Sequence, residues 1–573
     1  FMSAYGHKYL SLELDITPNR PDAFSHQGVA RDIAAATNRE FMPLSIESVQ
    51  TKGNESLSIT MENPEDCPRY IGGIVKNVKV GPSPEWMVER LKAAGQRSIN
   101  NLVDISNYVL LEMGHPTHIF DYDKLEQKEI HIRRAKKGES LTTLDEANHE
   151  LNETQLLITD GKTPIALAGV MGGLDTAVSE ETKSVLVESA YFDPVTTRKS
   201  AKSLHMNTDA SKRFERGADP EGAVNGFWRV VSLLQELAGG ELVSDMVDEY
   251  PKQITQSKIN LRRSELDLVL GHYVECKDVD RFLEALGFDH SYTETDWTCT
   301  PPSYRPDIER EIDVIEEIAR LVGYDTIPSD ENIYGTFRYE HPDPEIKIVP
   351  IQTTLVGFGF HQVYSNSLQN KQDSGLSGKP AVKMMNPLNQ EMAYLRTSLL
   401  PGLMKAADFN IKNGSPNIRL FELANVHEQS SDGFDGIKEY RHLAGIILGE
   451  ENSLSVHCDS SEEDLFTLKG YLSGLFSGKY RMRFELKRAD QPGFDYAQSI
   501  LINQQKVGAM GRLSSDWVQK MDLDIVNAYG FEINIEPLMK MMSGKKQFMP
   551  IAAFPKIQRD LNLVMNESQE VGP

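Results

Sequence analysis

The strongest hydrophobic pattern in the chain lies between residues 307 and 322. Apolar residues recur there every three or four positions, which is the spacing of a helix that buries one stripe. They are Ile308, Ile312, Ile315, Ala319 and Val322. Pro306 suits the position just before a first helical turn. The pattern therefore predicts a helix over 307–322.

One flank of this predicted helix is acidic. Asp313, Glu316 and Glu317 stand at positions i, i+3 and i+4, so their carboxylates lie side by side. Like charges this close repel each other, and a hard cation would relieve the repulsion. Oxygen-only ligands favour Mg²⁺ over zinc. Spacing alone leaves two interpretations open, a magnesium site and a solvated acidic face.

The remaining pattern divides the chain into three blocks. Residues 57–250 mix short strands with glycine turns and a few helices, and residues 258–328 contain helix-like stretches at 264–270 and 279–286. Residues 340–543 alternate helices and strands. No internal repeat or low-complexity segment is evident in the sequence.

Both ends of the chain look cut. Residues 9–16 read as a strand, and Ser25 could cap a helix over 26–37 after a proline-rich turn. Residues 554–565 read as a new strand close to the last residue. We therefore expect a truncated protein.

Composition places the chain among globular proteins. Its 573 residues correspond to about three to five domains. No apolar run approaches the length of a membrane helix, and no signal peptide opens the sequence. The four cysteines form no CxxC pair. We expect a cytoplasmic protein with no membrane association.

The net charge is −24 and the isoelectric point is about 5.1. Such a charge argues against an autonomous nucleic-acid binder, which needs a basic face. It does not exclude a local basic patch or a more basic partner subunit. Candidate patches are residues 133–137 and 198–202, and either could also be an ordinary solvated face.

Two segments carry candidate chemistry near the middle of the first block. His115, His118 and Asp121 could bind a metal, but Pro116 breaks helical geometry and no second His/Cys cluster is close. A loop histidine that hydrogen-bonds a ligand is the alternative. Residues 165–173 are glycine-rich and predict either a tight hairpin or the floor of a pocket, and not a dinucleotide fingerprint.

Two further features lie downstream. Glu188 stands in an apolar strand, where a carboxylate must be paired or functional. Residues 208–217 include Ser211, Lys212, Arg213 and Arg216, which could hold phosphate or form a solvated helix face. The chain contains no P-loop and no GxSxG motif.

Taken together, the ordered motifs resemble the family of bacterial phenylalanine–tRNA ligase beta subunits. The matching segments are 15–22 (DITPNRPD), 100–121, 167–173, 208–217 (TDASKRFERG), 303–317, 395–403 and 554–560. The resemblance covers essentially the whole chain. It implies that most of an N-terminal OB-fold module is missing.

The resemblance implies a multidomain α+β fold. It would contain a mixed α/β editing domain, a small helical or winged-helix-like domain, and a class II synthetase-like antiparallel-sheet domain. Residues 1–50 would belong to a domain completed by 255–330, which carries the acidic helix. The editing domain would span 57–250 and the inactive synthetase-like core 340–545. Residues 550–573 would begin a ferredoxin-like anticodon-binding domain.

It also implies an activity. Members of the family form (αβ)₂ heterotetramers in which the alpha subunit binds ATP and phenylalanine and charges tRNA(Phe). The beta subunit scaffolds the alpha subunit, binds tRNA and hydrolyses mischarged Tyr-tRNA(Phe). Arg419–Glu422 (RLFE) is similar to a class II motif 2 strand, and no glycine-rich motif 3 with its arginine is found. This chain would thus carry an editing site and not the aminoacylation site.

Site residues carry over from the resemblance position by position. The implied editing pocket comprises Ser106, Asn107, His118, Gly172, Glu188, Thr208 and Ala210. The implied Mg²⁺ site, near the αβ interface, comprises Asp307, Asp313, Glu316 and Glu317. Ser106 stands where the family often has threonine, and His115 stands where glutamine is usual. Two alternatives remain, a tRNA-binding scaffold with a dead pocket and a metallohydrolase using His115, His118 and Asp121.

Overall fold

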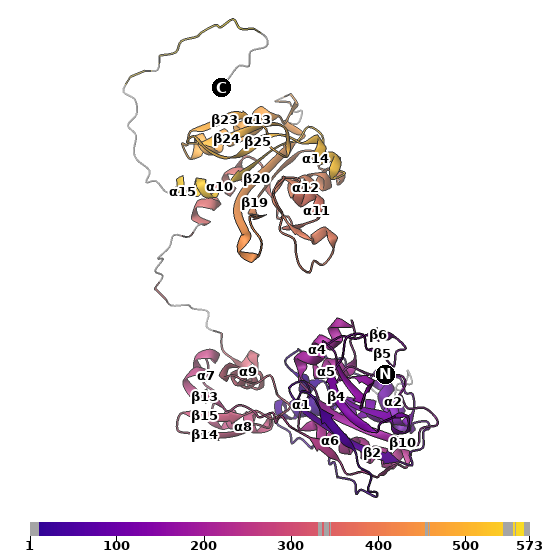
Figure 1. Cartoon of the computed structure of the whole chain (residues 1–573). Helices are drawn as coiled ribbons and strands as arrows, with labels where there is room; N and C mark the ends of the chain where they lie inside the picture. Colours follow the sequence, from indigo (N-terminus) through magenta and orange to yellow (C-terminus); the bar gives the residue numbers. More distant parts are fainter. Residues whose placement is uncertain are drawn as a thin grey trace. The chain divides into compact units, whose positions relative to one another are not determined.

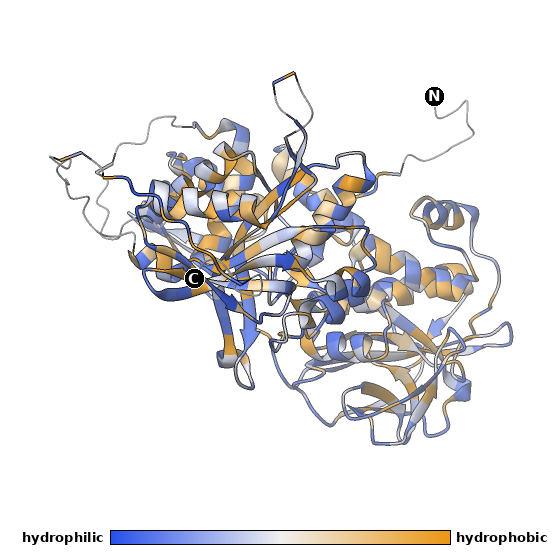
Figure 2. Ribbon diagram, turned by 90° about the horizontal axis from the view of Figure 1, so that it is seen from above, coloured by the Kyte–Doolittle hydropathy of each residue, from blue (hydrophilic) through white to orange (hydrophobic). Residues whose placement is uncertain are grey.

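The computed structural model describes residues 11–329, 335–336, 343, 345–452, 456–457, 459–541, 554–555 and 557–566. The chain divides into two compact units, Phe1–Ile333 and Tyr334–Pro573 (Figure 1). Hydrophobic and hydrophilic residues are interspersed along the helices (Figure 2), as expected for elements that bury one face. None of the described helices is both long and apolar enough to cross a membrane.

Two five-stranded sheets form the centre of the first unit. One has the order β1 (Ser58–Met61), β4 (Glu129–Arg134), β7 (Leu156–Asp160), β8 (Thr163–Leu167) and β9 (Met171–Gly172). The other has the order β11 (Glu241–Leu242), β2 (Arg69–Lys76), β10 (Ser184–Tyr191) and β3 (Thr117–Asp121), and β12 (Val247–Glu249) also pairs with β2. A single hydrophobic cluster contains residues of both sheets, so the sheets face each other.

Helices cover the outer face of the second sheet. They are α2 (Glu85–Ala93), α3 (Asn101–Met113) and α6 (Gly222–Ala238), which share a hydrophobic cluster with β2, β3 and β10. β10 is buried along its whole length because it has a layer on each side. Two shorter helices, α4 (Pro194–Ser203) and α5 (Asp209–Phe214), follow β10.

The rest of the first unit is a small helical subdomain. It contains α7 (Arg263–Leu270), α8 (Cys276–Ala285), α9 (Glu311–Val322) and a sheet of β13 (Ile259–Arg262), β15 (Asp296–Thr300) and β14 (Asp289–Tyr292). α1 (His26–Ala36) adds Ala35 to its hydrophobic cluster. The predicted helices at 26–37, 264–270 and 279–286 are confirmed, and Ser25 caps α1 by accepting from the Gly28 amide.

One helix boundary and two predicted strands differ from the prediction. α9 begins at Glu311 and not at 307, because the Asp313 carboxylate caps it by accepting from the backbone amides of Glu309 and Arg310 at 3.1 and 2.8 Å. Among the described residues of the predicted strands at 9–16 and 554–565, none pairs with another strand. Without a partner an extended segment cannot form a β ladder.

The second unit is built on a seven-stranded sheet. Its order is β16 (His361–Gln362), β19 (Ile418–Gln429), β20 (Ile437–Leu448), β26 (Tyr529–Asn534), β25 (Gln505–Leu513), β24 (Phe494–Ile502) and β23 (Phe484–Ala489). All neighbours are antiparallel except β16 and β19.

Helices lie on both faces of this sheet. One cluster joins it to α10 (Glu345–Gly357) and α13 (Leu465–Ser473), and another joins it to α12 (Leu400–Lys412) and α14 (Ser515–Lys520). The chain is therefore a mixed α/β protein with several sheets.

Candidate functional site

Glu188 lies at the centre of a buried sheet. In β10 it is paired in register with Gly72 of β2 on one side and His118 of β3 on the other. Its face of the strand is the one that meets the opposite sheet, because its neighbours Leu186 and Ala190 belong to the cluster between the sheets. The residue is 7% exposed, and burial raises the pKa of its carboxyl to about 8.

One oxygen of this carboxyl has a partner. The fully buried Tyr70 donates its hydroxyl to Glu188 Oε2 at 3.3 Å. Tyr70 lies two residues before Gly72 in β2, so the two residues share the inner face of the sheet. Gly72 has no side chain, and Leu57 and Ile59 occupy the space over it, opposite Glu188. A Cβ there would lie 2.8 Å from a Leu57 methyl group.

His118 connects the two sheets beside Glu188. Its ring packs edge-on against Phe120 at 4.4 Å between centroids, and burial lowers its pKa to about 4, so it is neutral at pH 7. Its Nε2 is buried and has no hydrogen-bond partner among the described residues. A Cβ at Gly172 would lie 2.5 Å from the ring, so this position of β9 requires glycine.

The predicted hydroxyl residues position neighbouring backbone. Thr208 caps α5, and its hydroxyl donates to the Val170 carbonyl at 2.8 Å, which holds the helix against the glycine-rich hairpin. Ser106 of α3 donates to the carbonyl of Thr117, directly before His118, at 2.6 Å. Both hydroxyls are thus engaged with backbone carbonyls in the described structure.

The structure does not place all seven predicted residues in mutual contact. Glu188, His118 and Gly172 are brought together, and Thr208 reaches the same hairpin as Gly172. Asn107 and Ala210 are partly buried on α3 and α5. No hydrogen bond joins either of them to Glu188 or His118 among the described residues. The assignment of the pocket therefore stays a prediction.

Sequence reasoning missed Tyr70. Its link to Glu188 depends on the register of β2 against β10, and no local pattern in the sequence reveals that register. It also missed Cys67, a fully buried thiol near Glu188. Burial and the neighbouring carboxyl raise the pKa of this thiol well above its ordinary value, which makes Cys67 a poor nucleophile.

The metallohydrolase alternative lacks a ligand set. Side chains alternate along β3, so His118 and Asp121 lie on opposite faces of the sheet. Asp121 accepts from the Thr182 hydroxyl at 2.6 Å on its own face. Among the residues that the structure describes, no group of three or more His, Cys, Asp or Glu side chains could hold a metal ion.

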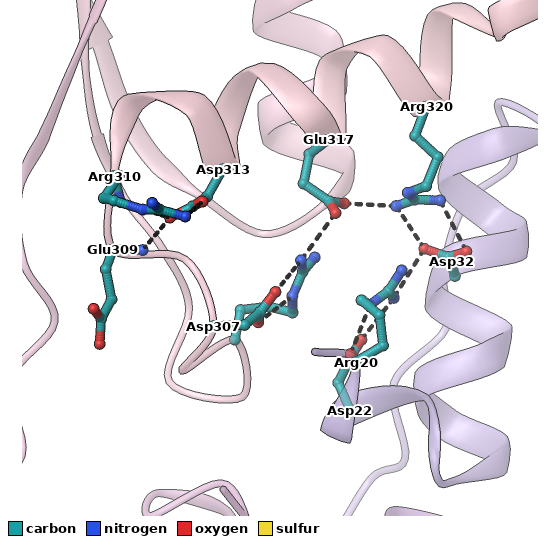
Figure 3. Close-up of polar contacts among 10 residues, drawn as sticks. Arg20, Asp22, Asp32, Asp307, Glu309, Arg310, Asp313, Glu317 and Arg320 are labelled. Atoms are coloured by element: carbon teal, nitrogen blue, oxygen red, sulfur yellow. Dashed lines mark hydrogen bonds and ion pairs between the residues drawn. The ribbon is translucent and has the colours of Figure 1, made fainter. Parts of the chain in front are cut away.

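The acidic helix is held by arginines (Figure 3). Glu317 is 2% exposed and accepts from Arg305 at 2.9 Å and from Arg320 at 2.6 Å. Arg305 also makes a two-pronged contact with Asp307 at 2.9 and 2.8 Å. Although burial opposes ionisation, the two arginines lower the pKa of Glu317 to about 2.

The same network ties α9 to α1. Arg320 donates to Asp32 at 3.0 Å, and Arg20 donates to the same carboxylate at 3.1 Å (Figure 3). Arg20 also pairs with Asp22. The residues involved come from opposite ends of the first unit's sequence. The buried charges therefore join the N-terminal helix to the small subdomain.

Most of the predicted magnesium ligands already have arginine partners in the described chain. Asp307 and Glu317 are paired with Arg305, and Asp313 pairs with Arg310 at 2.8 Å. Glu316 is exposed. Three of the four predicted ligands are thus already neutralised within the described chain. The predicted Mg²⁺ site was expected near an alpha subunit, and it stays a prediction for that assembly.

The strand similar to motif 2 is also closed by ion pairs. Arg419 of β19 pairs with Glu463 and donates to the Glu451 carbonyl at 2.9 Å. The buried Glu422 accepts from Arg396 at 2.8 Å. In this arrangement neither Arg419 nor Glu422 is free to hold a nucleotide.

The comparisons with known proteins cover nearly the whole chain. Family models match residues 66–239 (B3/4 domain), 259–324 (tRNA synthetase B5 domain) and 343–535 (phenylalanyl tRNA synthetase beta chain CLM domain). The phenylalanine–tRNA ligase beta subunits of Carboxydothermus hydrogenoformans and Halalkalibacterium halodurans are 37% and 36% identical to it. Each alignment covers 97% of this chain and 70% of the relative.

A solved structure was also matched. It is an N-terminal fragment of the phenylalanyl-tRNA synthetase beta subunit from Pyrococcus horikoshii, with 17% identity and a TM-score of 0.29. The match covers 54% of this chain and 85% of that chain.

Proposed function

Because the chain belongs to the family of phenylalanine–tRNA ligase beta subunits, we propose that its first unit hydrolyses tyrosine wrongly attached to tRNA(Phe). The chain would act in an (αβ)₂ ligase, as scaffold for the alpha subunit and as part of the tRNA-binding surface. The alpha subunit would bind ATP and phenylalanine and form the correct product.

The observation that supports the editing proposal is the buried carboxyl of Glu188. Phenylalanine and tyrosine differ by one hydroxyl, and a hydrophobic pocket cannot strongly reject a ligand that only adds this group. A second pocket that hydrogen-bonds the hydroxyl selects tyrosine for removal. Tyr70 already demonstrates the contact, because its phenol donates to one oxygen of Glu188 at 3.3 Å.

The neighbouring groups suit the same task. His118 is neutral, and its partnerless Nε2 lies beside Gly172, so a ligand atom could satisfy it. Ser106 and Thr208 donate their hydroxyls to backbone carbonyls, which argues against either as a nucleophile. Hydrolysis would therefore use a positioned water, with the terminal hydroxyl of the tRNA assisting.

The second unit would have no ligase activity of its own. The Arg419 side chain is held by Glu463 and by a backbone carbonyl, and the sequence lacks a motif 3 arginine. The isolated chain should not catalyse phenylalanine-dependent exchange of pyrophosphate into ATP. Exchange above the rate of a blank reaction would contradict this part of the proposal.

The editing proposal is tested in the assembled enzyme with Tyr-tRNA(Phe). Glu188→Ala, His118→Ala and Ala210→Trp should each slow hydrolysis, by about ten- to hundredfold for Glu188→Ala, which removes a hydrogen-bonding carboxyl. Charging with phenylalanine should be unchanged, and Glu126→Ala, at an exposed glutamate of the same unit, is the control. If all three variants clear Tyr-tRNA(Phe) at the parent rate, the pocket has been placed wrongly. If the parent itself does not clear it, the chain is a scaffold with a dead pocket.

A further inference from the structure

A cavity of about 300 Å³ lies in the first unit, apart from the proposed editing pocket. Its walls come from α1 and the turn before it, the turn after α3, the end of α5 with the segment that leads into α6, and the loop that contains Tyr304. None of the seven proposed editing residues lines it. The volume is at the lower end of the range of small-molecule sites.

A buried histidine without partners lines this cavity. His115 is 2% exposed, and neither of its ring nitrogens makes a hydrogen bond within the described residues. Burial dominates and lowers the pKa of the ring to about 4, although the Ala190 backbone acts in the opposite direction. A neutral imidazole ring offers one hydrogen-bond donor and one acceptor. Burying both without a hydrogen-bond partner carries a free-energy penalty. A polar ligand in the cavity would remove that penalty.

Two arginines of the cavity wall lack a close carboxylate. The Arg31 guanidinium stacks on the Tyr304 ring at 3.6 Å and makes no ion pair within the described structure. Arg213 donates to the backbone carbonyls of Phe24 and Asp209, each at 2.8 Å, and its ion pair with the Asp209 carboxylate is long, at 3.9 Å.

The acidic residues of the wall do not neutralise these arginines. Asp22 is paired with Arg20 at 2.9 Å, and Glu221 is paired with Arg69 at 3.0 Å. Asp219 remains, and it accepts from the backbone amide of Glu221 at 3.0 Å. Arg31 is therefore left without an ion pair among the described residues, whereas Arg213 keeps only its long contact with Asp209.

We propose that this cavity binds a small monoanion through a carboxylate or phosphate group, held by Arg31 and Arg213 and hydrogen-bonded by His115. Planar guanidinium groups match the oxygens of both kinds of anion, often with two parallel hydrogen bonds. The site would be separate from the editing reaction, and it does not depend on the proposed function.

The test titrates the full chain with inorganic phosphate and, separately, with benzoate, by calorimetry at constant ionic strength, since salt screens such contacts. At least one probe should bind saturably. Arg31→Gln should weaken that binding about ten- to hundredfold, because a charge-assisted contact is lost. Arg97→Gln, at an exposed arginine of the same unit, should leave it unchanged.

A second variant separates ligand binding from folding. Asn225 is exposed at the rim of the cavity, so Asn225→Trp should block entry while it keeps every wall charge. Stronger binding of phosphate would assign a phosphate-bearing ligand, and stronger binding of benzoate a carboxylate. Absence of saturable binding by both probes, or binding that Arg31→Gln and Asn225→Trp leave at the parent affinity, would overturn the proposal.

Discussion

Replacing Glu188 with glutamine should stabilise the first unit increasingly as the pH rises. The carboxyl of Glu188 has a pKa of about 8 in the folded chain, against an ordinary value of 4.5. Between these two values the unfolded chain has released a proton that the folded chain retains, so folding becomes less favourable as the pH rises. At pH 7 this penalty is about 3 kcal/mol, since one pKa unit corresponds to about 1.4 kcal/mol.

Glutamine does not ionise, so Glu188→Gln escapes this penalty. The free energy of unfolding of the variant minus that of the parent should be constant below pH 4.5, rise by about 3 kcal/mol up to pH 7, and level off above pH 8. The amide must find its own hydrogen bonds, and this adds an offset to the free energy of unfolding that does not change with pH. The slope with pH is therefore the decisive quantity.

The assay is urea unfolding at pH values from 4 to 9. Trp86 and Trp228 pack on the outer face of the sheet that contains Glu188, so their fluorescence reports on this domain. Glu126→Gln, at an exposed glutamate, is the matched control and should follow the parent at every pH. A difference between Glu188→Gln and the parent that stays flat from pH 5 to pH 8 would refute the reasoning.

Three other predictions concern the remaining contacts. Tyr70→Phe removes the hydroxyl that donates to the Glu188 carboxyl and should lower the ratio of Tyr-tRNA to Phe-tRNA hydrolysis several-fold. Tyr191→Phe, in the same hydrophobic cluster, should leave this ratio unchanged. A Tyr70→Phe ratio equal to that of the parent would contradict the positioning role of Tyr70. Glu317→Gln removes a buried carboxylate partner of Arg305 and should destabilise the first unit by about 3 kcal/mol or more above pH 4.5. This loss of stability should shrink as the pH falls toward 2, where the parent carboxylate becomes protonated. Thermal unfolding that matches the parent at pH 7 would contradict it. Glu316→Gln, or removal of Mg²⁺ by a chelator, should weaken association with the alpha subunit in sedimentation; unchanged association on both treatments would remove the magnesium site.

Periodicity predicted the elements better than their ends. The apolar stripe of α9 was found because Ile315 belongs to the core of the small subdomain and Val322 packs against it, although Ile312 of the same stripe is exposed. Its first turn was placed too early, since the Asp313 side chain ends the preceding loop by capping the helix at Arg310. A cap depends on one side chain, and the hydrophobic pattern does not contain it.

The site was only partly accessible from the sequence. The resemblance pointed to Glu188, and the apolar strand around it indicated burial. Tyr70 could not be found, because it reaches Glu188 across a strand pair whose partners are 118 positions apart in the chain. The acidic spacing on α9 suggested a cation site because the spacing shows only local neighbours. It does not reveal the ion-pair network, in which Arg320 contacts Asp32, 288 positions away in the chain.

Two buried glutamates of the first unit show how burial leads to opposite chemistry. Glu317 meets two arginines, so its pKa falls to about 2 and its charge serves to hold α9 and α1 together. Within the described part of the chain, Glu188 meets only the hydroxyl of Tyr70, so burial dominates and its pKa rises to about 8. A carboxyl whose charge is already matched has little to gain from a ligand, whereas one left with a single weak partner gains from each added donor. The unmatched residue, and not the more conspicuous acidic helix, is therefore where this chain is expected to recognise its substrate.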